Sequence, residues 1–344
     1  MRYRRLVKAA VKALAFRAAE ATGLTKAIGG SRWRSRRVLV LCYHGVATRD
    51  EHEWNPELYV TPAHLRQRYR LLQDMGATVL MLDRALELAR SGALPPRAVA
   101  ITFDDGASNF ASHAVPILRE FGFPATVYVT TYYVTHQLPV WNIAARYIEW
   151  ATRHAPAPDA SAIRNLVDAD AGRPPGRAAL LDAFLRQWQG RGSMDQDGAI
   201  HELASALGFD DRVMRESRMW HLMSPAEVAG LPRDLVSVQL HTHRHRQPED
   251  WSGFAGEIEE NREALEGLVG YRPVHFCYPS GIVRPGFPGY LARLGVESAT
   301  TCAPGLLGPH TDAHLAPRLI DTMLTPETTF RAWVAGTGAL ISRS

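Results

Sequence analysis

Cysteine is scarce in this chain of 344 residues. The three cysteines are Cys42, Cys277 and Cys302, and no two of them form a CxxC pair. This spacing argues against a disulfide framework and against a structural zinc site built from cysteines. Each thiol lies in or beside an apolar segment, where a buried, reduced side chain is the ordinary state. The pattern fits a reducing compartment.

Long apolar runs are also missing. No stretch reaches the roughly 18 uncharged apolar residues of a membrane-spanning helix. A secretory signal peptide needs an unbroken apolar run of about 7–15 residues, and Lys8 and Lys12 interrupt the segment VKAAVKALAF. We therefore expect neither a spanning helix nor a usable signal peptide, and we expect the protein to act on the cytoplasmic side.

The basic charge of the chain is concentrated at its start. Residues 1–37 hold eleven Lys and Arg and one acid, Glu20, so this leader carries +10 and leaves −6 for the rest, given +4 overall. On a helix, the basic residues share one face and apolar residues share another: Arg5, Lys8 and Lys12, against Val7, Val11, Leu14 and Ala18. Such a helix either lies on anionic lipid or packs on the protein's own surface.

If the leader binds lipid, we expect residues 1–20 to give reversible contact with the inner membrane face. That contact would bring the mouth of a barrel near lipid-linked sugars. Nucleic acid is a poorer partner, because aromatic residues do not alternate with these charges.

The body of the chain alternates short apolar runs with helical patterns. Such alternation favours βα units and a mainly parallel sheet or barrel within one domain. The predicted strands cover 38–42, 78–81, 98–103, 125–129, 236–240 and 275–278, and the predicted helices cover 61–72, 111–121 and 253–268.

Residues 132–220 interrupt this rhythm, because they lack strong strands and contain helical patterns such as 178–189. We interpret them as a helical insertion within a catalytic domain spanning 38–335. The organisation expected is therefore a leader (1–37), this domain and a tail (336–344).

Two neighbouring carboxylates follow the predicted strand 98–103, in the segment TFDDG. Asp104 and Asp105 leave the strand in different directions, so one can ligate a cation while the other acts on water. Gly106 permits a tight turn after them. A capping pair at the start of a helix is an equally good interpretation of this fragment alone.

Three histidines occur within five residues after the predicted strand 236–240. His241 and His245, four residues apart, can converge on one side of a turn, and His243 then faces elsewhere. Thr242 can hydrogen-bond the backbone or a ligand. Two imidazoles and one carboxylate leave open positions for water and substrate, as catalytic zinc or iron sites require. Since strand ends of a parallel sheet share one edge, these residues are expected to meet there.

Together these motifs resemble the polysaccharide deacetylase (NodB-homology) family, carbohydrate esterase family 4. The resemblance covers about residues 38–335 and rests on TFDDG at 102–106, HTHRH at 241–245 and FCYPSG at 276–281, the last similar to exopolysaccharide-associated members. YHGV at 43–46, WN at 141–142 and APRL at 316–319 add weaker support. The resemblance implies a distorted (β/α) barrel with a helical insertion.

The resemblance also implies roles for individual residues. Asp104 would be the general base, and Asp105, His241 and His245 would bind a divalent metal, commonly zinc, with other first-row metals also used in the family. The backbone of Tyr278 would stabilise the oxyanion. Thr242, Arg272 and Pro279 would contact substrate, with Arg272 where the family often has an arginine near the base.

The general acid departs from the family pattern. The family usually offers a late histidine in an L-x-H setting to protonate the leaving amine, and neither His310 nor His314 has that setting. His44 is the alternative to His314, because it follows the first strand and can reach the same edge of the sheet.

The activity implied is a metal-dependent hydrolysis of N-acetyl groups on amino sugars. The substrate would be a poly- or oligosaccharide or a lipid-linked glycan in cell-surface polysaccharide biosynthesis. The alternatives are an O-acetyl esterase on the same fold and a pseudoenzyme that binds glycan without turnover.

Overall fold

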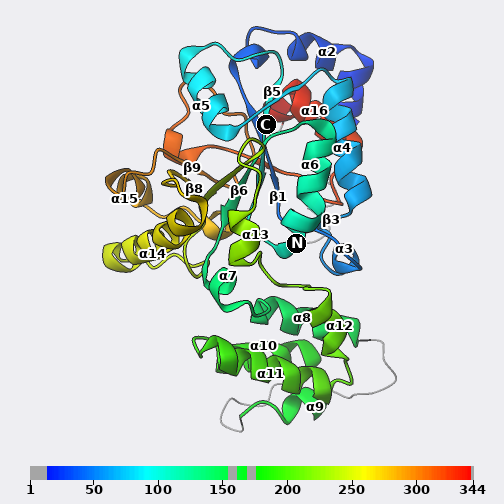
Figure 1. Ribbon diagram of the computed structural model, residues 1–344. Coiled ribbons are helices and arrows are strands. Elements are labelled where there is room, and N and C mark those ends of the chain that lie inside the picture. Colours follow the sequence, from blue (N-terminus) through cyan, green and yellow to red (C-terminus); the bar gives the residue numbers. More distant parts are fainter. Residues whose placement is uncertain (1–13, 154–160, 169–175, 342–344) are drawn as a thin grey trace.

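The computed structural model describes residues 14–153, 161–168 and 176–341 (Figure 1). Its main sheet has eight strands, all paired in parallel, in the order β10-β1-β5-β6-β7-β8-β9, with β4 beside the first half of β5. The strands are β1 (Leu39–Tyr43), β4 (Thr78–Leu80), β5 (Ala98–Phe103), β6 (Ala125–Val129), β7 (Val236–Leu240), β8 (His275–Cys277), β9 (Ser298–Thr300) and β10 (Leu319–Ile320). A separate pair joins β2 (Gly45–Val46) to β3 (Tyr59–Val60).

The two edges of the sheet approach each other through Ala316, three residues before β10. Its carbonyl accepts a hydrogen bond from the Thr301 amide, and its amide donates to the Ala299 carbonyl, both at 2.9 Å. The sheet therefore curls toward closure, and the expected distorted (β/α) barrel is confirmed.

Helices cover the outside of the sheet and begin and end at recognisable signals. Thr61 caps α4, accepting from the His64 amide at 3.1 Å, and Gly122 ends α6 in the left-handed conformation. The barrel helices are α4 (Pro62–Asp74), α5 (Leu82–Ser91), η2 (Phe110–Ala114), α6 (Val115–Phe121), α13 (Pro225–Ala229), α14 (Trp251–Val269), α15 (Phe287–Arg293) and α16 (Glu327–Ala335). Shorter ones are α3 (Glu51–Trp54), η4 (Pro279–Gly281) and η5 (Ala313–Leu315).

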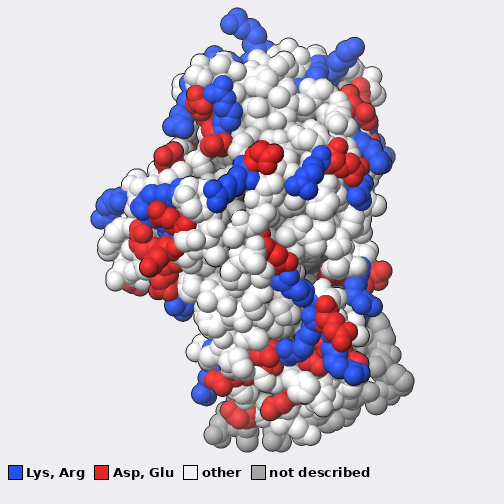
Figure 2. All heavy atoms as spheres, in the orientation of Figure 1, with Lys and Arg blue, Asp and Glu red and all other residues white. Residues whose placement is uncertain are grey.

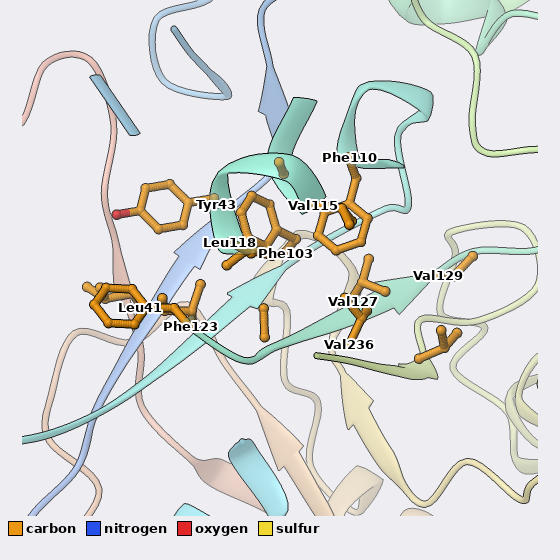
Figure 3. Close-up of a cluster of buried hydrophobic side chains, with 14 of the residues drawn as sticks. Leu41, Tyr43, Phe103, Phe110, Val115, Leu118, Phe123, Val127, Val129 and Val236 are labelled. Atoms are coloured by element: carbon orange, nitrogen blue, oxygen red, sulfur yellow. The ribbon is translucent and has the colours of Figure 1, made fainter. Parts of the chain in front are cut away.

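The core lies between the sheet and these helices (Figure 3). Val115 and Leu118 pack over aromatic and β-branched side chains of the central strands, among them Phe103 and Val127. Every residue of β1, β5 and β6 is buried, as expected for strands covered on both faces. A rigid sheet of this kind can hold polar groups at its edge in fixed positions.

The segment between β6 and β7 forms the expected helical insertion, at the far end of the molecule from α2 in Figure 1. It has its own apolar core, which includes Ile148, Phe184 and Leu203. Trp220 packs against Trp54 and Tyr59 of the barrel, with ring centroids 4.9 and 5.3 Å apart. Its helices are α7 (Tyr132–His136), α8 (Trp141–Ala151), α9 (Ser161–Arg164), α10 (Arg177–Trp188), α11 (Ser193–Ala206) and α12 (Asp211–Glu216).

The structure moves both outer boundaries expected from the sequence. Arg34, placed in the leader, is fully buried and donates to the carbonyls of Val334 and Ala98 at 2.9 and 3.2 Å. Residues 337–341, expected as a tail, form α17 (Thr337–Ile341), which packs on α2 (Leu24–Gly29) and α16. Both segments therefore pack on the body, since Arg34 reaches the first residue of β5 and α17 contacts α16.

The leader helix buries a different face from the one expected. Residues 14–21 are helical, but Phe16 and Ala19 are the buried ones, while Leu14 is 68% exposed and Ala18 is exposed. The remaining residues of the expected faces, all within 1–13, lie outside the described part. None of the helices searched, all within the described residues, has the length and hydrophobicity needed to span a membrane.

Candidate metal centre and active site

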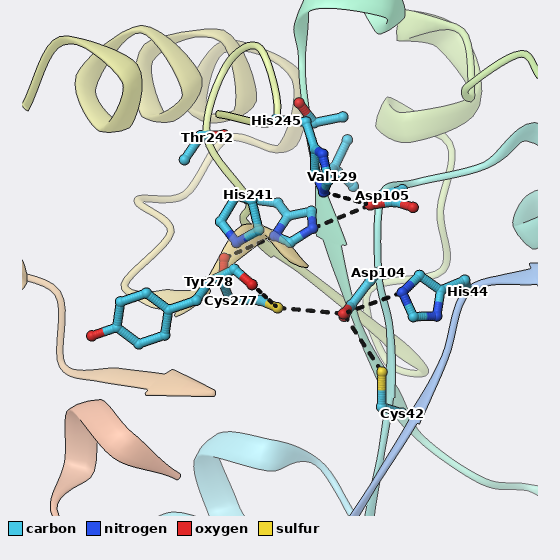
Figure 4. Close-up of polar contacts among 12 residues, drawn as sticks. Cys42, His44, Asp104, Asp105, Val129, His241, Thr242, His245, Cys277 and Tyr278 are labelled. Atoms are coloured by element: carbon cyan, nitrogen blue, oxygen red, sulfur yellow. Dashed lines mark hydrogen bonds and ion pairs between the residues drawn. The ribbon is translucent and has the colours of Figure 1, made fainter. Parts of the chain in front are cut away.

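The polar motifs gather at the carboxyl ends of the strands, as the parallel arrangement predicts. Asp104 follows β5, His241 follows β7, and His44 follows β1 by one residue. Figure 4 shows His241 and His245 pointing toward Asp105, while His44 points toward Asp104. Residues that are far apart in the chain thus form one cluster.

Three side chains present ligand atoms to a common point. Nε2 of His241 lies 3.2 Å and Nε2 of His245 lies 3.3 Å from Oδ1 of Asp105, and their ligand atoms all lie within 4.8 Å of one another. Ligands bound at about 2.0–2.1 Å around a tetrahedral ion are themselves about 3.3 Å apart. The donor set and its spacing therefore fit a divalent cation such as zinc.

Backbone contacts fix the orientation of His241. Its Nδ1–H donates to the Cys277 carbonyl at 2.8 Å, which leaves Nε2 facing Asp105. Asn261 of α14 accepts from the His241 amide at 2.9 Å and donates to the Val129 carbonyl at 2.9 Å. Buried Asn261 thereby ties the ends of β6 and β7 together beneath the ligands. The sequence motifs did not indicate this role, although a buried amide inside a helix is a usable signal.

Backbone strain is concentrated at the same turns. Asp105, Thr242 and His245 all have positive φ, at 69°, 64° and 54°, a conformation that costs non-glycine residues free energy. Gly106 follows with φ of 83°, and a Cβ there would lie 2.9 Å from Cγ1 of Val129. The predicted tight turn after the aspartate pair is confirmed, and only glycine fits it.

Asp104 does not join the ligand triad directly but is held by an arginine. The Arg318 guanidinium donates from Nη1 to Oδ1 and from Nη2 to Oδ2, each at 2.7 Å. Both side chains are buried, and the thiols of Cys42 and Cys277 lie 3.5 and 3.4 Å from Oδ2. Arg318 belongs to the APRL segment, but the sequence did not predict its role.

The electrostatic surroundings keep Asp104 ionised. Burial by itself would raise its pKa, but the charge and hydrogen bonds of Arg318, helped by His44 and His241, hold the pKa well below its usual range. Burial likewise opposes ionisation of Asp105, and His241, His245 and His44 outweigh it, so its pKa is also lowered. Two adjacent carboxylates can therefore both be charged in this site.

The two candidates for the general acid lie in different places. His44 lines the cleft, with Nε2 3.9 Å from Oδ2 of Asp104. His314 is not among the residues lining the cleft, and its Nε2–H donates to the Val296 carbonyl at 2.7 Å. Of the two, the geometry favours His44.

The expected oxyanion donor is already used. The Tyr278 amide donates to the Thr300 carbonyl at 3.2 Å, and the residue is fully buried with its ring directed away from the aspartates in Figure 4. The Tyr278 amide is thus already engaged between strands, and an oxyanion role for the backbone around Tyr278 stays a prediction.

Two expected substrate contacts prove to be structural. Thr242 is fully buried, and its hydroxyl accepts from the Arg246 amide at 3.2 Å, so it holds the turn between the histidine ligands. Pro279 is buried, and its carbonyl accepts from Gln247 at 2.7 Å. His243, expected to face elsewhere, does so: its Nδ1 lies 2.8 Å from the Thr131 hydroxyl.

Arg272 was expected near the base and is not there. It lies on the surface after α14, with Nη1 3.9 Å from Glu266 and its side chain 54% exposed. Arg318 occupies the position beside Asp104 instead. Tertiary folding, rather than sequence proximity to a motif, decides which arginine lies beside Asp104.

A cleft of about 760 Å³ contains this centre and separates the strand ends from the insertion. This volume lies within the range of small-molecule and saccharide sites. One wall carries the cluster of aspartates and histidines. The other consists of insertion residues, including Trp141, Tyr133, Arg146, Arg186 and Trp220. Asn109 of the barrel also lines it and accepts from the Val46 amide at 3.1 Å.

Comparison with known proteins agrees with this geometry. The polysaccharide deacetylase family model matches residues 91–169, which include both aspartates. The poly-β-1,6-N-acetyl-D-glucosamine N-deacetylase of Escherichia coli K12 is 31% identical over 94 residues, 27% of this chain. Both matches are to polysaccharide deacetylases, and each is confined to a part of this chain. The expected resemblance to the polysaccharide deacetylase family is thereby confirmed over this segment. The alignment covers only 14% of that relative, so the chain spans a small part of the relative's length.

Solved structures show that the deacetylase resemblance extends over most of the fold. The Streptococcus pyogenes deacetylase PplD, in complex with acetate, has a TM-score of 0.55 at 16% identity, covering 84% of this chain and 94% of that one. IcaB from Ammonifex degensii has a TM-score of 0.54 at 18% identity, covering 88% and 97%. At these identities the likeness concerns the fold alone.

Proposed function

We propose that this protein hydrolyses N-acetyl groups from amino sugars of a glycan, using a divalent metal held by Asp105, His241 and His245. The observation that carries the proposal is the juxtaposition of these ligands with an ionised, arginine-bound carboxylate, Asp104, inside one cleft. Zinc is the first choice of ion, since two imidazoles and one carboxylate with open positions suit it.

Each polar residue has a separate task in this scheme. A cation at the triad supplies Lewis-acid chemistry, polarising the acetamide carbonyl and acidifying the attacking water. Asp104 accepts the proton as that water adds to the carbonyl carbon. Arg318 keeps Asp104 in place and ionised.

The leaving nitrogen needs a proton when the C–N bond breaks. His44 is the proposed donor, because it lines the cleft next to Asp104. The products are then acetate and a free amino sugar. Without a donor the nitrogen would leave as a poor, negatively charged group, so His44 should affect the step of bond cleavage.

The walls of the cleft support a saccharide as substrate. Trp141, Tyr133, Tyr59 and Trp220 present aromatic surface to it, and aromatic rings offer apolar area together with a polar tip. The curated relative's name states an N-deacetylase of a poly-N-acetylglucosamine. We therefore propose a role in making cell-surface polysaccharide, with a polymeric, oligomeric or lipid-linked glycan as substrate.

Acetate release tests the proposal and its two alternatives. Purified protein loaded with zinc is incubated with N-acetylglucosamine oligomers and with O-acetylated saccharides. The proposal requires acetate from the N-acetylated series. Release from O-acetylated sugars alone would indicate an esterase, and metal-free protein that binds glycan without turnover would indicate a pseudoenzyme.

A further inference from the structure

The insertion contributes a positive charge to the cleft that no ion pair among the described residues neutralises. Arg186, on α10, lines the cleft and is exposed. Among the described residues its guanidinium has no hydrogen bond, ion pair or ring contact. An arginine held on a helix, with five N–H donors directed to a cleft, is suited to bind oxygen atoms of a ligand.

The other charges of the cleft are compensated. Arg146 of α8 pairs with Asp182 at 3.0 Å, and Arg244 pairs with Glu257 and Glu260 at 3.1 and 2.8 Å. On the opposite wall, Arg318 balances Asp104. The charge of Arg186 is therefore the local excess on the insertion wall.

The excess is local rather than a property of the whole surface. Among the described residues on the face shown in Figure 2, basic and acidic side chains are mixed over the insertion, without a broad area of one sign. General attraction of polyanions therefore does not explain Arg186. Gln189, the residue that ends α10, and Asn142 of α8 also line the cleft and are exposed. Their amides can donate further hydrogen bonds to the same group.

We infer that the insertion wall forms an anion subsite, centred on Arg186, for a phosphate or carboxylate carried by the glycan. The inference rests on the proposed function, because that function is the reason for taking the ligand to be a glycan. The proposed metal centre and Arg186 line opposite walls of one cleft. The anionic group therefore belongs to a part of the glycan other than the acetamido group that is hydrolysed. A phosphate and a carboxylate each present a pair of oxygen atoms that can accept two parallel hydrogen bonds from a guanidinium.

Three probes distinguish the possibilities: a neutral N-acetylglucosamine trisaccharide, the same trisaccharide with a phosphate at its reducing end, and a tetrasaccharide alternating N-acetylglucosamine with glucuronic acid. Binding is measured by calorimetry on zinc-loaded full-length protein in the Asp104→Asn background, which prevents turnover. Acetate release is measured in parallel on protein with Asp104 intact.

The variants have opposite expected effects. Arg186→Gln should weaken binding of an anionic probe by about 10-fold or more, the usual effect of losing a hydrogen bond between charged groups, and leave the neutral probe unchanged. Asp182→Asn should strengthen anionic binding, because it releases Arg146. Arg191→Gln is the matched control, since Arg191 is exposed on the insertion but does not line the cleft.

An anionic probe that bound only to the metal would bind Arg186→Gln and its parent equally, since the metal centre is the same in both. A phosphate-only or a carboxylate-only effect identifies the group recognised. Equal affinity of Arg186→Gln and its parent for all probes would overturn the inference. Selective anion binding without acetate release from any probe would instead overturn the proposed function and leave the subsite standing.

Discussion

At the scale of single residues, the two adjacent aspartates have different partners because the turn after β5 sends them in different directions. Asp104 turns inward to Arg318, and Asp105 turns toward the histidines. The same turn places Asp105 at positive φ. This geometry suits the proposed division between a residue that accepts a proton and residues that hold an ion.

Asp104→Asn should abolish turnover while leaving metal content nearly intact, whereas His241→Ala should lose both. Removing a general base typically lowers the rate by about 10²–10⁴-fold. Metal content is measured by elemental analysis of protein purified in zinc, alongside acetate release. Equal loss of metal in the two variants would show that Asp104 is also a ligand.

Arg318→Met should destabilise the fold by about 3–5 kcal/mol, because it leaves a buried carboxylate without a partner. The folded-state pKa of Asp104 is lowered, so the contribution of the pair is present above about pH 4, the unfolded pKa, and declines as pH falls further. Urea unfolding measures the difference at pH 7 and again below pH 4.

Arg272→Met is the matched control for that experiment. Its side chain is on the surface, so the change should stay within about 0.5 kcal/mol. A larger effect at Arg272 than at Arg318 would contradict the assignment of the arginine beside the base.

Metal binding should release a proton from His241. Burial opposes protonation, but Cys277, Asp105 and Asp104 outweigh it and raise the pKa of His241 well above its usual value in the metal-free protein. His241 is then protonated at neutral pH, and Nε2 must lose its proton to bind an ion. Affinity should therefore rise with pH up to that pKa. Calorimetry in buffers of different ionisation enthalpy counts the protons released, and no release at pH 6–7 would contradict the prediction.

At the scale of elements, the turn at the end of β5 limits what the site can tolerate. A left-handed conformation costs a non-glycine residue about 1–2 kcal/mol. Gly106→Ala should destabilise the protein by more than this, because the new Cβ would also lie 2.9 Å from Cγ1 of Val129. It should also weaken metal binding, since Asp105 precedes it.

Gly122→Ala provides the comparison, because Gly122 also has positive φ but a Cβ there has nothing within 4 Å. It should show the backbone cost and keep its metal affinity. Thermal unfolding and zinc titration measure both quantities. Equal effects of the two substitutions would mean that the contact with Val129 is relieved without displacing Asp105.

At the scale of the whole molecule, the leader and the cleft lie at opposite ends. Arg34 bonds the carbonyl of Ala98, the first residue of β5, whereas Asp104 follows its last residue. Six strand residues separate these ends by about 17–20 Å. The described part of the leader therefore lies at the end of the barrel opposite the cleft. If this part contacted a membrane, it would hold the cleft away from the lipid surface instead of near it.

Contact of residues 1–20 with anionic lipid, and a cytoplasmic location, stay predictions. Each basic residue near such a surface contributes about 1 kcal/mol, so binding should need anionic lipid, weaken with salt and vanish when residues 1–20 are deleted. Sedimentation with phosphatidylserine liposomes measures it, with phosphatidylcholine liposomes as the control. Failure of the full-length protein to bind at low salt, or export with a cleaved leader, would refute it.

Local patterns alone predicted the strands 98–103, 125–129 and 236–240 and the helical insertion, whereas the resemblance to the deacetylase family supplied the proposed ligand set. These depend on short-range periodicity and on motifs at strand ends, both of which are visible in the sequence. Residues whose roles need contacts across the sheet were decided by tertiary structure. Arg318 rather than Arg272 reaches the base, His44 rather than His314 lines the cleft, and the Tyr278 amide is used by Thr300. A side chain's partner depends on which strands become neighbours, and no local pattern records that.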